Sequence, residues 1–191
     1  MKHLLLILVV MSSFSARAIP FPDPVPGLMA ALQFCTQIED ETVIPACVRI
    51  ESSANWFTKE ALPICMQQSF DEDRVRCLRG IQNSDIRVEE VQVCESLTFD
   101  DEKARCLAEI NRPFPYRTRL KVDPTPGLQA ASRLCQSFFS DEDKRRCLRE
   151  LSAADLFTVD AVGFCASRFS DDEKIQCLGC RLLQPLSIAG C

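Results

Sequence analysis

The sequence predicts an all-α fold built from five tandem helical hairpins, each stapled by a disulfide. Ten of the twelve cysteines fall into five pairs with eleven residues between partners. The pairs are Cys35 with Cys47, Cys65 with Cys77, Cys94 with Cys106, Cys135 with Cys147, and Cys165 with Cys177. The first cysteines of successive pairs lie 30, 29, 41 and 30 residues apart. A period near 30 is typical of tandem helical repeats.

The start of the chain resembles a secretory signal peptide. Lys2 is followed by an unbroken apolar run over residues 4–10, and Ala16 and Ala18 are small residues at the positions expected before a cleavage site. We therefore expect residues 1–18 to be removed and the mature chain to reach the periplasm or the extracellular space. The apolar run is shorter than the ~20 residues of a membrane span, and we expect no span in the mature chain. A retained amphipathic anchor is the alternative.

Composition excludes several kinds of chemistry. Cleavage after Ala18 removes Lys2 and Arg17 and leaves 20 basic against 27 acidic residues. Such an acidic chain is a poor candidate for binding nucleic acid. Cleavage also removes His3, the only histidine, so Ser-His-Asp and Cys-His catalysis and imidazole zinc sites are excluded. We expect no metal, no cofactor and no catalytic residue.

Two segments of the chain share a pattern of identical residues at a constant offset of 100. Residues 23–80 match residues 123–180 without a gap. The matches include Pro26-Gly27-Leu28 with Pro126-Gly127-Leu128 and Phe57 with Phe157. The four cysteines of the first segment also align with the first four cysteines of the second, Cys135, Cys147, Cys165 and Cys177. A duplicated two-repeat block explains this pattern, with one further repeat, Cys94 to Cys106, between the copies.

The first helix of each repeat should carry the leading cysteine. Pro26 and Pro126 suit the first turns of two of these helices. Asn55 and Asp155 are the predicted N-caps of two others. An alanine four residues before the cysteine, as at Ala61, lies on the same helical face and lets a neighbouring helix approach closely.

The second helix should begin at an acidic cluster. These clusters are Asp71-Glu72-Asp73, Asp100-Asp101-Glu102, Asp141-Glu142-Asp143 and Asp171-Asp172-Glu173. Carboxylates stabilise a helix N-terminus, and Ser140 and Ser170 resemble the caps of capping boxes. In the first repeat the acidic residues lie upstream, and Pro45 suits the first turn. Calcium binding is the alternative, but the clusters lack the glycine of a calcium loop.

The two cysteines of a pair should face each other across an antiparallel hairpin, which favours pairing within each repeat. Bridges between repeats are the alternative. Cys180 and Cys191 are left to close the C-terminus. We predict three hairpins in residues 19–112, a proline-rich linker in residues 113–126, and two hairpins with a C-terminal disulfide loop in residues 127–191. Together they form a short α-solenoid or two compact blocks.

Candidate contact residues come from two places. The linker region gathers the basic and aromatic residues Arg112, Tyr116, Arg117, Arg119 and Lys121. They are predicted to contact either the neighbouring block or an acidic partner, and a solvated linker is the alternative. Trp56 and one of the pair Phe138-Phe139 are candidates for exposed interaction anchors, and burial in the core is the alternative.

The leading functional hypothesis is a secreted or periplasmic, non-catalytic scaffold that binds a protein partner. A disulfide-rigidified effector or enzyme inhibitor is the second hypothesis. A thiol oxidoreductase is the third, because Cys177 and Cys180 form a Cys-x-x-Cys motif. Two adjacent structural disulfides are the favoured explanation of this motif.

Overall fold

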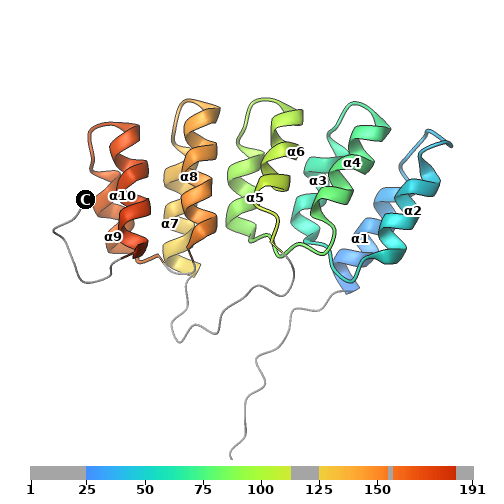
Figure 1. Cartoon of the computed structure of the whole chain (residues 1–191), viewed down its shortest axis with the longest axis horizontal. Coiled ribbons are helices and arrows are strands. Elements are labelled where there is room, and N and C mark those ends of the chain that lie inside the picture. The colour runs from blue at the N-terminus through green and yellow to red at the C-terminus, as the bar shows by residue number, and fades with distance from the viewer. Residues whose placement is uncertain (1–24, 113–124, 155–156, 184–191) are drawn as a thin grey trace, which may run out of the picture.

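The computed structural model describes residues 25–112, 125–154 and 157–183, which form ten α-helices and one short 3-10 helix. Five antiparallel hairpins stand side by side in one row (Figure 1). The first helices are α1 (Val25–Cys35), α3 (Leu62–Met66) preceded by η1 (Lys59–Ala61), α5 (Val88–Glu95), α7 (Thr125–Gln136) and α9 (Val159–Ala166). The second helices are α2 (Ile44–Ser53), α4 (Asp71–Ile81), α6 (Asp100–Glu109), α8 (Asp141–Ala153) and α10 (Asp171–Leu183). The predicted all-α array of hairpins is confirmed.

Each hairpin contains the disulfide expected from the cysteine spacing. The five bonds join the predicted partners within a repeat, with Cα–Cα distances between 5.3 and 5.7 Å. Each bond closes a loop of about a dozen residues, which is worth about 3 kcal/mol on the chain-entropy model. Cys180, in α10, is also disulfide-bonded. Its expected partner, Cys191, lies outside the described residues.

A continuous apolar core runs through the row and surrounds the disulfides. Ala31, Ala61 and Ala131, each four residues before a leading cysteine, are fully buried. Their small side chains allow the first helices of neighbouring hairpins to pack closely. A single two-helix hairpin buries too little apolar surface to fold alone, so stacking and disulfides stabilise the row together.

The duplicated Pro-Gly-Leu motif has a steric explanation. A Cβ atom on Gly27 would lie 2.0 Å from the carbonyl oxygen of Phe57, and one on Gly127 would lie 1.7 Å from that of Phe157. In both copies the first helix of one hairpin therefore packs directly on the backbone that leads into the next hairpin. Only glycine leaves room for this approach.

The predicted caps of the second helices are present, but those of the first helices are not. Ser140 accepts the backbone N–H of Asp143 at 3.0 Å, and Ser170 accepts that of Glu173 at 3.2 Å. Helix α9 is capped by Thr158 and not by Asp155, which lies outside the described residues. Asn55 was also predicted as a cap, and this prediction is wrong because helical structure begins only at Lys59.

The segment before η1 explains why Asn55 does not cap a helix. Phe57 is buried in the core, with 1% of its surface exposed, and the chain must pass extended through this position before it turns into a helix. The side chain of Asn83 holds this segment by accepting the backbone N–H groups of Asn55 and Trp56. Asn83 itself adopts a left-handed backbone conformation with φ of 57°, which asparagine tolerates better than most residues.

The third and fourth hairpins pack directly on each other. Helix α5 contacts both α7 and α8, so the row continues across the position of the linker (Figure 1). The linker was predicted to span residues 113–126, but α7 already begins at Thr125, and residues 113–124 lie outside the described part of the chain. Among the described helices, none is long and apolar enough to cross a membrane.

Candidate interaction surface

The turns within the five hairpins lie along one edge of the row, opposite the connections between hairpins (Figure 1). We call this edge, with the first turns of the second helices, the tip edge. It comprises residues 36–43, 67–73, 96–102, 137–143 and 167–173. Its residues come from all five repeats and are held at one end of the molecule by the disulfide-closed hairpins.

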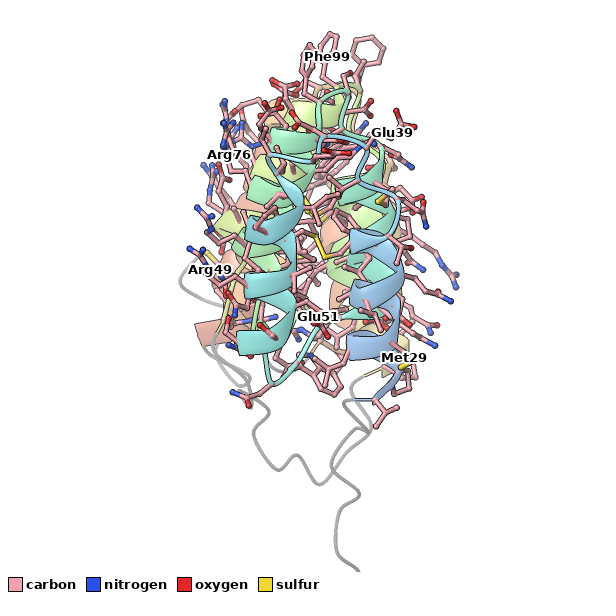
Figure 2. All side chains as sticks on the ribbon, turned by 90° about the vertical axis from the view of Figure 1, so that its right-hand side faces the viewer. Met29, Glu39, Arg49, Glu51, Arg76 and Phe99 are labelled. Atoms are coloured by element: carbon pink, nitrogen blue, oxygen red, sulfur yellow. A yellow bond between two sulfur atoms is a disulfide. The ribbon has the colours of Figure 1, made fainter. Side chains whose placement is uncertain are left out.

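Four phenylalanines project from the tip edge into solvent. Phe70, Phe99, Phe139 and Phe169 are exposed to 67%, 61%, 99% and 99%. Figure 2 shows Phe99 projecting from the tips, at the same end of the molecule as Glu39 and far from Met29. We call these residues the phenylalanine row. Burying one phenylalanine stabilises a complex by about 1.5–3 kcal/mol, so a partner that covered the four exposed rings would gain a large binding free energy.

Local structure explains why the rings face outward. Phe70 and Phe99 occupy the N-cap positions of α4 and α6, where the backbone is extended. In the fourth and fifth hairpins a serine takes the position before the first aspartate, and the phenylalanine lies one residue earlier. The position just before the ring faces inward in the fourth hairpin, where Phe138 is 3% exposed. One of the pair Phe138-Phe139 is therefore exposed and the other belongs to the core.

Hydrogen bonds join neighbouring tips and fix their spacing. The carboxylate of Asp71 accepts the backbone N–H groups of Glu39 and Asp40, both at 2.8 Å. Two hairpins further on, the carboxylate of Asp141 accepts the N–H of Thr98 at 2.9 Å. The second and third tips are joined by a side-chain amide and not by a carboxylate.

Those two tips are joined by Gln68, which donates to the carbonyl of Asp100 at 2.7 Å. Between the fourth and fifth hairpins, Arg146 forms an ion pair with Asp172 at 2.6 Å. All four pairs of adjacent hairpins are thus connected at or near the tips. The phenylalanine row is consequently presented on a rigid frame.

These contacts keep two carboxylates charged. The backbone N–H of Asp40 is the main cause that holds the pKa of Asp71 below its ordinary value, against partial burial, with Glu39 and Arg74 acting in the same direction. Burial alone would raise the pKa of Asp141, but the N–H of Thr98 and the ammonium of Lys144 outweigh it and lower the pKa. The tip edge therefore stays anionic over the physiological pH range.

The structure places the sequence-predicted contact residues elsewhere. Trp56 is buried, with 9% of its surface exposed, so of its two alternatives burial in the core is confirmed and the exposed anchor is excluded. It lies beside Phe57 near the connections between hairpins, where the chain passes through the core. Arg112 was predicted to contact either the neighbouring block or an acidic partner, and it contacts the neighbouring block through the carbonyl of Ser152. Tyr116, Arg117, Arg119 and Lys121 lie outside the described residues and stay predictions.

Arg112 belongs to a buried ionic cluster at the junction of the third and fourth hairpins. It pairs at 2.6 Å with the fully buried carboxylate of Glu90, which also pairs with Arg87 at 3.3 Å. Arg87 donates to the carbonyl of Ala154 at 2.8 Å, and Arg112 donates to that of Ser152 at 2.7 Å. Positive charge at the C-terminal end of α8 stabilises that helix, so the cluster serves the fold.

Neither cysteine of the Cys-x-x-Cys motif is a free thiol. Cys177 is bonded to Cys165, and Cys180 is also oxidised, so the Cys-x-x-Cys motif is not a bridge between its own two cysteines. Among the residues that the structure describes, no cluster of three or more histidine, cysteine or carboxylate side chains converges on a position for a metal ion.

Most of the phenylalanine row was not predicted from the sequence. Phe70, Phe99 and Phe169 were not singled out, although each stands one or two residues before an acidic cluster. This recurrence in four repeats was the available signal. No protein-family model, no curated protein and no solved structure matches the chain. The candidate surface therefore rests on the geometry alone.

Proposed function

We propose that the chain is a secreted or periplasmic, non-catalytic scaffold that binds a protein partner along its tip edge. The observation that carries this proposal is the phenylalanine row. Monomeric soluble proteins seldom expose aligned large aromatic side chains unless the surface binds another molecule. Aromatic side chains are also enriched among the residues that dominate binding energy.

The scaffold suits this role in two respects. Helical repeats present extended surfaces whose length grows with the number of repeats. A disulfide in every hairpin favours an oxidising compartment and limits the entropy lost when a rigid surface binds. The predicted basic contact around Tyr116 is a second candidate surface.

Site-specific photo-crosslinking in the producing cell tests the proposal. A photoreactive phenylalanine analogue at Phe99 should capture a protein partner. The same analogue at Phe164, a 42% exposed ring on α9 outside the tip edge, serves as the matched control. Capture from position 164 but from none of the four tip positions would contradict the proposal. The intact mass of the exported protein, expected to start at Ile19, tests the compartment.

A further inference from the structure

The tip edge combines its exposed rings with a concentration of negative charge. It contains fifteen of the chain's 27 acidic residues and only one of its 22 basic residues, Arg168. Every phenylalanine of the row therefore stands beside carboxylates. A partner surface that covers the rings must also meet these charges.

Cations within the hairpins offset only part of this charge. Seven lysine or arginine side chains pair with the acidic clusters: Arg74, Arg76, Lys103, Lys144, Arg146, Arg149 and Lys174. Glu72 and Asp101 are exposed and form no ion pair with the described residues. The tip edge keeps a net negative charge.

The same surface favours cations next to its rings. A lysine or arginine placed over an aromatic face gains about 0.5–2 kcal/mol. The chain itself contains this contact, because the guanidinium of Arg168 lies 4.3 Å from the centre of the Phe164 ring. Exposed carboxylates beside the rings would attract the same cations. They would repel anionic lipid headgroups, which disfavours an acidic membrane as the occupant.

The spacing expected between packed hairpins is close to the rise of one helical heptad. Packed helices lie about 8–10 Å apart, so the rings should recur along the row at roughly that distance. A heptad advances a helix by about 10.5 Å, so one residue per heptad can meet one ring per hairpin. Helical peptides commonly bind through such a periodic apolar face.

We infer that the tip edge binds a cationic amphipathic helix of a partner polypeptide. This inference rests on the proposed function and gives the partner its chemistry. Apolar side chains of the helix cover the phenylalanine row, and its lysines and arginines meet the carboxylates of the acidic clusters.

The test uses the oxidised mature protein and a synthetic lysine–leucine heptad peptide, with binding measured by calorimetry at two salt concentrations. Substitution of all four rings (F70S, F99S, F139S and F169S) should weaken binding at least about tenfold, because the rings supply the apolar contact. M29S removes an exposed apolar side chain at the opposite end of the molecule and should leave binding unchanged. E72Q with D101N should weaken binding at low salt and reduce its salt dependence.

Fold integrity is checked by circular dichroism and disulfide mapping of each variant. Equal affinity for a glutamate–leucine peptide, or for the protein without its four tip rings, would overturn the inference. Binding to zwitterionic lipid vesicles in place of the peptide would also overturn it. If the peptide fails while position 99 still captures a protein partner, the inferred charge and helicity are wrong and the proposed function stands.

Discussion

The Nη2 atom of Arg112 lies 2.6 Å from both carboxylate oxygens of Glu90, whose side chain is fully buried. Arg112 follows the third hairpin directly, and its other terminal nitrogen reaches the carbonyl of Ser152 at the end of α8. The pair therefore connects the third hairpin to the fourth at the position where the repeat spacing is interrupted.

Replacing Glu90 with glutamine should destabilise the fold by about 3 kcal/mol, because it leaves Arg87 and Arg112 without their buried counter-charge. Urea unfolding followed by circular dichroism measures the change. Glu89→Gln, on the same helix and only partly buried, is the control and should cost less than about 0.5 kcal/mol. Equal effects of the two substitutions would show that the buried cluster does not stabilise the junction.

Substituting Gly27 or Gly127 with alanine should lower the melting temperature. The new Cβ atom would overlap the carbonyl oxygen of Phe57 or Phe157, and relieving this overlap should cost about 1–3 kcal/mol. Gly163→Ala is a matched control, since a Cβ there meets no atom within 4 Å. Alanine favours a helix over glycine, so the control should be neutral or stabilising by up to about 1 kcal/mol. Unchanged melting of both clash variants would contradict the close packing.

Stability should fall in acid partly through Asp71. Its pKa in the folded protein is lowered, mainly by the N–H of Asp40, so its contribution is complete above the unfolded pKa of about 3.9. The contribution is lost as the pH falls through the folded pKa. Asp71→Asn should therefore be less stable than the wild type at pH 7, and the difference should shrink in acid. Glu72→Gln removes an equal, exposed charge, and a similar pH dependence of both variants would argue against the contact between tips.

The regular part of the fold was predictable because one local pattern determines it. Cys77 lies twelve positions after Cys65, and an antiparallel hairpin places residues at this separation opposite each other, 5.3 Å apart between Cα atoms. The acidic residues after Ser140 and Ser170 predicted helix starts for a similar local reason. These patterns involve residues close together in the sequence, so they can be recognised without knowledge of the tertiary structure.

The candidate site was less predictable because exposure depends on how the hairpins stack. Phe138 and Phe139 are adjacent and chemically identical, yet one is 3% exposed and the other 99%. Trp56 resembles an exposed anchor in sequence, but its segment passes through the core. Arg112 forms an ion pair with Glu90, 22 residues earlier in the chain, and no periodic pattern in the sequence indicates that contact.

Removing a disulfide from the middle of the row should have a wider effect than removing one from its end. Without a bond between Cys94 and Cys106 (both to alanine), the third hairpin should lose about 3 kcal/mol, and its neighbours on both sides lose a stable surface to pack on. Without the bond between Cys35 and Cys47, the loss should be similar in size but confined to α1 and α2 and the face of the second hairpin. Hydrogen exchange followed by mass spectrometry distinguishes the two patterns. If exchange in α7 and α8 stayed as slow in the Cys94/Cys106 variant as in the Cys35/Cys47 variant, the hairpins would not depend on their neighbours, and the row would behave as a chain of independent units.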